Sequence, residues 1–121
     1  MKREKYVLAI DLGTGGPKTA LVSTHGEVAG HELILVETRY LPGGGAVQDP
    51  HEWWSAIVSS ARKLLAGGIV GPADVVAVAC TGQWGSTVPV DARGEPAGDC
   101  ILWMDNRGAP YSAKLVGGPV Q

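Results

Sequence analysis

The sequence predicts an α/β fold, in which strands and one long helix share a chain of 121 residues. Two apolar runs, "YVLAI" (residues 6–10) and "VVAVACTG" (residues 75–82), have the composition of strands buried on both faces. Between them, residues 53–65 carry apolar side chains at helical spacing. Because this helix lies between two strands, it forms a crossover, and the later strand is expected to return parallel to an earlier one.

Three consecutive strands are predicted before the helix. The first run ends at Asp11, and a turn of Gly13–Gly16 leads to a second strand over residues 18–23. The polar turn "HGE" (residues 25–27) then leads to a third strand over residues 28–38. These connections are too short for crossovers, so the three strands should be antiparallel.

The helix carries its own start and stop signals, after an expected loop over residues 41–47. Asp49 can cap the helix, Pro50 fits its first position, and Glu52 completes an acidic variant of the capping box. Gly67 can end the helix in the left-handed conformation. The apolar positions are Trp53, Trp54, Ile57, Val58, Ala61, Leu64 and Leu65. Because the two tryptophans are adjacent, one is expected in the core and the other partly exposed.

Three antiparallel strands, a helix and a parallel strand make the βββαβ order of the ribonuclease H-like architecture, to which actin- and hexokinase-type ATPases belong. Further strands are predicted at residues 87–91 and 100–105, and Asp91 is expected to be a hairpin residue. On this architecture Asp11 lies at the carboxyl end of a central strand, where open α/β sheets form their ligand crevices.

Composition narrows the class of protein. The formal net charge is −2, and no cluster of Lys and Arg follows the first five residues, so neither nucleic-acid nor membrane-surface binding is predicted. The first apolar run is too short for a signal peptide. Cys80 and Cys100 form no C-x-x-C motif, so a reducing cytoplasm is expected, with each cysteine a small buried hydrophobe. His25, His31 and His51 are expected at the surface and not as metal ligands.

The ending "VGGPVQ" (residues 116–121) shows no cap or closing element, so we expect an incomplete domain cut within something larger. Such a domain would expose apolar surface that is normally covered. Self-association, for example as a homodimer, is therefore expected.

The turn after the first strand is a candidate phosphate site. Backbone N–H groups of Gly13–Gly16 can surround a phosphate, Thr14 adds a hydroxyl, and Lys18 adds a counter-charge. Asp11 would hold Mg²⁺ or its water shell. The same residues also suit a tight hairpin with Asp11 bonded to turn amides, and the two interpretations stay open. A Walker A loop is excluded, because Pro17 precedes Lys18 and a strand follows.

Four segments together resemble the N-terminal part of the FGGY carbohydrate kinases, with the xylulose kinase branch nearest. They are "AIDLGTGGPKTALV" (residues 9–22), "QDPHEWW" (48–54), "CTGQWGS" (80–86) and "ILWMDNR" (101–107). The resemblance implies transfer of a phosphoryl group from ATP, with Mg²⁺, to a sugar such as xylulose or a related pentulose or polyol. It also implies a second domain that supplies the catalytic base and the adenosine site, so that residues 1–121 alone have no turnover and hold no catalytic base.

The resemblance assigns site residues one by one. The ATP and Mg²⁺ positions match Asp11, Gly13, Thr14, Gly15 and Lys18, with Asp11 nearest the metal. The sugar positions match Gln83, Trp84, Trp103, Asp105 and Arg107, with the Trp103 indole packed on the sugar's carbon skeleton. The pair Trp84-Gly85 departs from the Met-His of pentulose kinases and the Arg-Glu of glycerol kinases. A hydroxyl-reading side chain is therefore missing unless Ser86 or a water replaces it.

Other functions fit parts of the pattern. A ribonuclease H-like nuclease would use Asp11 as the first of several carboxylates that grip two metal ions, although the acidic net charge opposes nucleic-acid binding. A stand-alone nucleotide- or sugar-binding module and an inert fragment are the non-enzymatic alternatives.

Overall fold

The computed structural model describes residues 3–117. Contacts divide the chain into two compact units. The first unit contains the chain up to Glu37 together with His51–Gln83, and the second contains Thr38–Pro50 together with the chain from Trp84 onward. Each unit is described by itself.

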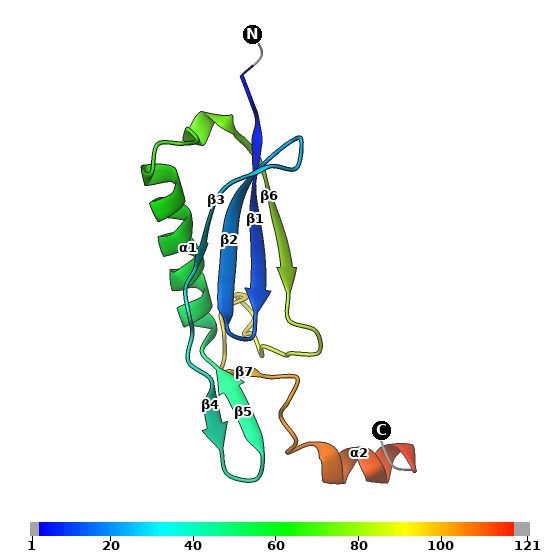
Figure 1. Cartoon of the computed structure of the whole chain (residues 1–121). Coiled ribbons are helices and arrows are strands. Elements are labelled where there is room, and N and C mark those ends of the chain that lie inside the picture. The colour runs from blue at the N-terminus through cyan, green and yellow to red at the C-terminus, as the bar shows by residue number, and fades with distance from the viewer. Residues whose placement is uncertain (1–2, 118–121) are drawn as a thin grey trace. The chain divides into compact units, whose positions relative to one another are not determined.

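The first unit is built on a four-stranded sheet (Figure 1). Its strands are β1 (Tyr6–Gly13), β2 (Gly16–Ser23), β3 (Val28–Leu33) and β6 (Val75–Gly82), in the spatial order β3-β2-β1-β6. β2 is antiparallel to both β1 and β3, whereas β6 is parallel to β1. The predicted βββαβ order is therefore confirmed.

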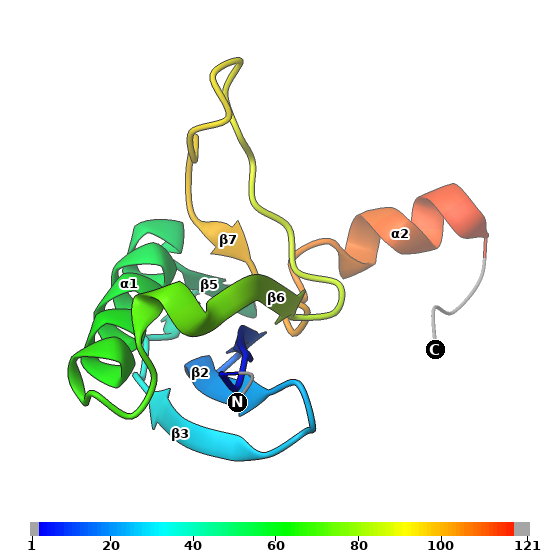
Figure 2. The same cartoon turned by 90° about the horizontal axis from the view of Figure 1, so that it is seen from above.

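The predicted helix, α1 (Pro50–Ala66), lies against one face of this sheet (Figure 2). Lys63 Nζ lies 2.8 Å from Glu32 Oε2 on β3. Thr19 and Leu21 of β2 are fully buried, and the alternation of side chains places both on the same face as Glu32. Trp53 is half-buried and Trp54 is exposed, so the two differ as predicted, but neither is in the core.

The helix ends at Ala66, directly before Gly67 as predicted, but Gly67 is not the left-handed residue. The N–H of Gly67 donates to the carbonyl of Lys63 over 3.2 Å, which continues the helical bonding pattern. The left-handed conformation occurs at Gly68, where φ is +72°. A short 3₁₀ helix, η1 (Pro72–Asp74), then leads into β6.

The third strand is shorter than predicted, because β3 ends at Leu33 and not at residue 38. Beyond it, the N–H groups of Ile34 and Val36 donate to the carbonyls of Pro17 and Gly15 over 3.3 and 3.2 Å. The chain after Leu33 therefore stays bonded to the start of β2 and to the β1–β2 turn without forming regular strand pairs.

The prediction of a loop over residues 41–47 is wrong. β4 (Arg39–Leu41) and β5 (Gly45–Gln48) form an antiparallel hairpin there. Gly43 and Gly44 make its bend with φ values of +76° and +84°, a conformation that glycine adopts without a steric penalty. The glycine run that suggested a loop is the turn of this hairpin.

The second unit adds β7 (Cys100–Ile101), antiparallel to β5, and the unpredicted helix α2 (Ala109–Val116). The strands predicted at residues 87–91 and 100–105 are wrong over most of their length. Thr87 and Val90 form isolated bridges, and the N–H of Asp105 donates to the carbonyl of Leu102 in a turn. Single bridges and a turn replace a continuous ladder here.

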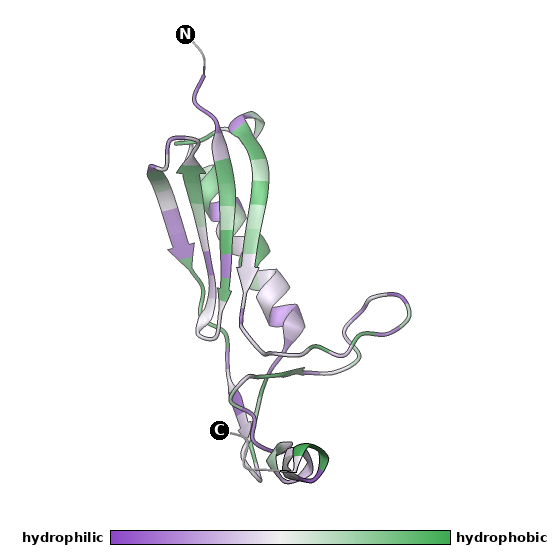
Figure 3. Ribbon diagram, turned by 90° about the vertical axis from the view of Figure 1, so that its right-hand side faces the viewer, coloured by the Kyte–Doolittle hydropathy of each residue, from purple (hydrophilic) through white to green (hydrophobic). Residues whose placement is uncertain are grey.

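Burial differs from prediction at β6. This strand is at the edge of the sheet, and every residue after Val75 is exposed, including Cys80. The predicted double burial of β6, and the predicted burial of Cys80, are therefore wrong, although the strand is strongly apolar (Figure 3). Cys100 is fully buried as predicted, and burial raises the pKa of its thiol. Among residues 3–117, the helices are too short or too polar to span a membrane.

Candidate functional site

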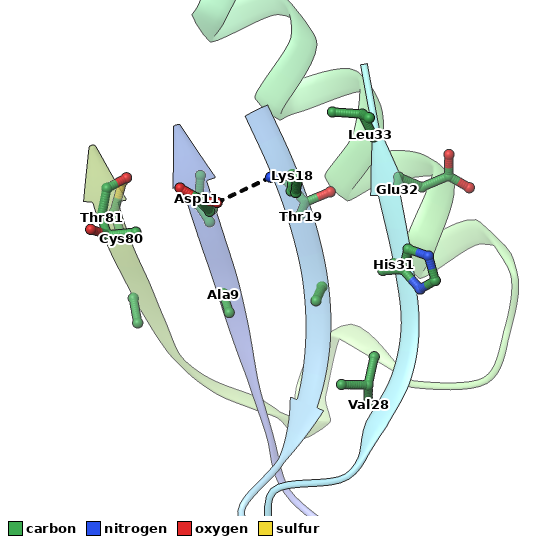
Figure 4. Close-up of a pocket in the computed structure, with 13 residues that line it drawn as sticks. Ala9, Asp11, Lys18, Thr19, Val28, His31, Glu32, Leu33, Cys80 and Thr81 are labelled. Atoms are coloured by element: carbon green, nitrogen blue, oxygen red, sulfur yellow. Dashed lines mark hydrogen bonds and ion pairs between the residues drawn. The ribbon is translucent and has the colours of Figure 1, made fainter. Parts of the chain in front are cut away.

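Asp11 and Lys18 occupy directly opposed positions on β1 and β2. Asp11 lies near the carboxyl end of β1, as predicted, and its Oδ2 is 3.5 Å from Lys18 Nζ (Figure 4). At least half of each side chain is exposed. This pair therefore presents both a carboxylate and an ammonium group to solvent at the end of the central strands.

The two side chains border a hollow of about 750 Å³ on the sheet. Ala9, Ala20 and Ala79 lie side by side in the strand register and share a face with Asp11 and Lys18. Because their side chains are small, they leave space above the sheet. This face is opposite the one that α1 contacts, since successive side chains of a strand point to opposite sides.

Three carbonyl groups at the β1–β2 turn accept hydrogen bonds from the first unit. The carbonyls of Gly13, Gly15 and Pro17 accept hydrogen bonds from Gln83 Nε2 and from two backbone N–H groups of the segment after β3. Carbonyl oxygens repel an anion, so bonding them to protein donors favours a phosphate at this turn. The predicted residue Gln83 is in this way brought beside the predicted phosphate loop.

Glycines 15 and 16 have different surroundings. A Cβ added at Gly15 would have no described atom within 4 Å, so its backbone is open to close approach. A Cβ at Gly16, where φ is +131°, would lie 2.1 Å from the carbonyl oxygen of Ile34. The hairpin interpretation is correct in requiring a positive φ. The Asp11 carboxylate, however, pairs with Lys18.

Two exposed tryptophans lie in the second unit. Trp84 is 88% exposed and Trp103 is 55% exposed, although tryptophan side chains are usually mostly buried. The N–H of Trp103 donates to Ser86 Oγ over 3.2 Å, which ties the segment after Trp84 to the one that carries Trp103. Ser86, the predicted substitute for a sugar-reading hydroxyl, therefore has a backbone partner.

Asp105 and Arg107 form an ion pair in the same unit, with 2.7 Å between Nη2 and Oδ2. The Asp105 side chain is 3% exposed and that of Arg107 is 42% exposed. Hydrogen bonds from Arg107 and from the N–H of Ala46 hold the pKa of the Asp105 carboxyl well below its usual range. The same pairing raises the pKa of Arg107.

The predicted site residues therefore fall into two groups. Asp11, Gly13, Thr14, Gly15, Lys18 and Gln83 belong to the first unit, and Trp84, Trp103, Asp105 and Arg107 to the second. The sequence interpretation missed Gly45 and Ala46, which contact the Asp105–Arg107 pair. Their only sequence signal was a glycine run taken for a loop. In the described part of the chain, no three His, Cys, Asp or Glu side chains gather as metal ligands.

Comparison with known proteins decides the family. Residues 6–117 match the N-terminal domain of the FGGY family of carbohydrate kinases. The chain belongs to this family. A curated glycerol kinase from Paracidovorax citrulli is 32% identical over 111 residues, which cover 91% of this chain and 22% of the relative.

Solved structures of FGGY-type kinases share the fold. A xyloylose kinase from Brucella ovis superposes with a TM-score of 0.84 at 26% identity, over 91% of this FGGY chain and 23% of its own. A xylulose kinase from Bifidobacterium adolescentis gives a TM-score of 0.64 at 31% identity, over 98% of this chain and 22% of its own. The predicted ribonuclease H-like, actin/hexokinase-type fold is confirmed. The chain spans less than a quarter of the length of these relatives.

Proposed function

We propose that this chain forms the opening part of an ATP-dependent carbohydrate kinase that phosphorylates a pentulose such as xylulose, or a related polyol. The observation that carries the proposal is the exposed Asp11–Lys18 pair beside the open backbone of Gly15. Phosphoryl transfer depends mainly on positioning and on charge stabilisation, which such a turn can supply.

The nucleotide part of the proposal assigns roles to five residues. Backbone groups of Gly13, Thr14 and Gly15 face the phosphates of ATP, and Lys18 balances their charge. Asp11 holds Mg²⁺ through its water shell. Its half-exposed carboxylate fits this role, because Mg²⁺ keeps several waters and takes one or two carboxylates together with phosphate oxygens. The bound ion would neutralise charge on the phosphates.

The sugar part of the proposal rests on the two exposed indoles. Trp103, and with it Trp84, would cover the carbon face of the substrate, because indole rings combine a large apolar face with a polar edge. Gln83 and Arg107 would meet hydroxyl groups, and Asp105 supports Arg107. The compared proteins include both glycerol and xylulose kinases, so we keep the substrate class as pentulose or polyol.

The catalytic base, the second phosphate motif and the adenosine site would belong to a second domain outside residues 1–121. The chain by itself should then bind ligands weakly and turn nothing over. We place the complete enzyme in the cytoplasm, and we expect the isolated chain to form homodimers through its uncovered apolar surface.

The test compares this chain with the product of the coding sequence that continues beyond Gln121. ADP release is measured with Mg·ATP and either D-xylulose or glycerol. We expect turnover by the longer chain and none by residues 1–121. A stop codon after Gln121, with no second kinase domain encoded nearby, would count against the proposal.

Calorimetric titration separates the non-enzymatic alternatives. If the chain binds sugar or nucleotide and the longer product shows no turnover, a stand-alone binding module is favoured. If no ligand gives a binding heat, an inert fragment is favoured. Mg²⁺-dependent cleavage of an RNA–DNA hybrid would instead support the nuclease alternative.

A further inference from the structure

Both oxygens of the Asp105 carboxylate accept hydrogen bonds from residues of the second unit. Oδ2 accepts the N–H of Ala46 over 2.9 Å and Arg107 Nε and Nη2 over 3.0 and 2.7 Å. Oδ1 accepts the N–H and Nε of Arg107 over 3.0 and 3.1 Å. With 3% of the side chain exposed, this carboxylate offers a ligand almost no surface.

These bonds join the turn after β7 to the β4–β5 hairpin. The N–H of Leu102 donates to the carbonyl of Ala46 over 3.0 Å, and the N–H of Asn106 donates to the carbonyl of Gly44 over 2.9 Å. Together with the Asp105–Ala46 bond, these make three hydrogen bonds that hold β5 and the turn before it against residues 102–106.

Gly45 makes room for the guanidinium. A Cβ at this position would lie 2.8 Å from Leu41 Cβ, 2.9 Å from Arg107 Nε and 3.1 Å from Arg107 Cδ. The Arg107 side chain therefore lies directly on the backbone of β5, held there from one side by Asp105. The Arg107 side chain as a whole is 42% exposed, so part of it remains open to solvent.

The chain contains a second pair with the same spacing, Asp91 and Arg93. Asp91 Oδ1 accepts the N–H of Arg93 over 2.8 Å, and Oδ2 accepts Arg93 Nε and Nη2 over 3.2 and 3.1 Å. Its other backbone donor is Glu95, in the same turn. The pairing geometry is thus shared, whereas the bond to a distant strand belongs to Asp105.

We propose that Asp105 is a positioning residue, which does not touch substrate but holds the Arg107 guanidinium and the β4–β5 hairpin in one arrangement. The assignment of Arg107 to the sugar rests on the proposed function. The positioning itself does not, because it is a property of the chain without ligand. A fork-shaped donor such as Arg suits this role better than Lys, since both carboxylate oxygens are bonded at once.

The experiment records ¹H–¹⁵N spectra of the 121-residue chain and follows the Arg107 Nε–H signal and the exchange of the Ala46 amide with water. In Asp105→Asn we expect the Nε–H signal to shift or vanish and the Ala46 amide to exchange at least about tenfold faster. Asp91→Asn, the matched control, should change the Arg93 Nε–H signal and leave Ala46 unaffected. The Ile101 amide, which donates to the Thr87 carbonyl within the second unit, reports whether that unit is folded in each variant.

A second variant leaves the carboxylate in place. Gly45→Ala should displace Arg107 and shift its Nε–H signal even if Asp105→Asn fails to fold. Unchanged Arg107 and Ala46 signals in a folded Asp105→Asn chain would overturn the proposal. Sugar titration is read separately: a chain that binds no sugar but shows these shifts contradicts the proposed function and supports the positioning role.

Discussion

Asp11 and Lys18 face each other across the β1–β2 ladder, with 3.5 Å between Oδ2 and Nζ and both side chains largely in solvent. An exposed ion pair of this kind adds little to stability, generally below ~1 kcal/mol. Its position beside the turn at Gly15, and not its energy, is what makes it a candidate for binding Mg·ATP.

Removing the Asp11 carboxylate should weaken nucleotide binding without unfolding the chain. For Asp11→Asn we expect Mg·ATP affinity to fall about tenfold, which is about 1.4 kcal/mol, because the water shell of the metal loses a charged partner. Isothermal titration calorimetry measures the affinity, and urea unfolding measures the stability. Asp91→Asn, which removes a carboxylate from the hairpin of the second unit, is the control. Equal affinities for wild type and Asp11→Asn would remove Asp11 from the site.

Alanine substitutions at the adjacent glycines Gly15 and Gly16 should differ in their effect on stability. Gly15→Ala should leave the free energy of unfolding within about 1 kcal/mol of wild type, because the new methyl group meets no described atom. It should still weaken Mg·ATP binding at least about tenfold, since the methyl group lies where a phosphate would approach.

Gly16→Ala is the matched comparison. Its methyl group would overlap the carbonyl oxygen of Ile34, so we expect a loss of about 2 kcal/mol or more in urea unfolding. If Gly15→Ala bound Mg·ATP as tightly as wild type, the turn would be a structural hairpin only.

The exposed indoles should become protected by sugar. Trp84 and Trp103 should show reduced acrylamide quenching of fluorescence in the presence of xylulose or glycerol, because a bound sugar covers their faces. Trp103→Phe should lower the sugar affinity about threefold to tenfold. Trp54→Phe, at an exposed position on α1, serves as the control. Protection that persists in Trp103→Phe but disappears in Trp54→Phe would place the sugar elsewhere.

The buried carboxylate of Asp105 should give stability a characteristic pH dependence. Its pKa is lower in the folded chain than in the unfolded chain, where it is about 3.9. The stabilisation is therefore complete above about pH 4 and is lost as the pH falls through the folded pKa. Asp105→Asn should be less stable than wild type at pH 7, and the difference should shrink below pH 4 in urea titrations. A difference that stays constant with pH would show that the charge of Asp105 is not what stabilises the fold.

The open face of the sheet should cause self-association. Leu33 borders the hollow on this face and is about half exposed. We expect a concentration-dependent mass in analytical ultracentrifugation that is reduced by Leu33→Lys. Leu35→Lys, at an exposed position outside the hollow, is the control and should have little effect. A mass equal to one chain at the highest concentration would contradict the expectation.

The order of the main elements follows from signals that are local in the sequence. Apolar runs at β1 and β6 and the signals around Pro50 depend on neighbouring residues, so the βββαβ order and the long helix could be read from the chain. The turn with Asp11, Gly15 and Lys18 could also be predicted, because its residues lie close together in the sequence.

Tertiary structure decided what depends on partners distant in sequence. The exposure of Cys80 follows from the place of β6 at the sheet edge, and a strand's apolar composition does not reveal which neighbours cover it. Likewise, "PGGG" is the turn of the β4–β5 hairpin, and β5 of this hairpin pairs with β7, about fifty residues later in the chain. The buried carboxylate of Asp105 depends on Ala46 of that hairpin, so its role as a bonded and inaccessible group could be recognised only once the two segments were seen together.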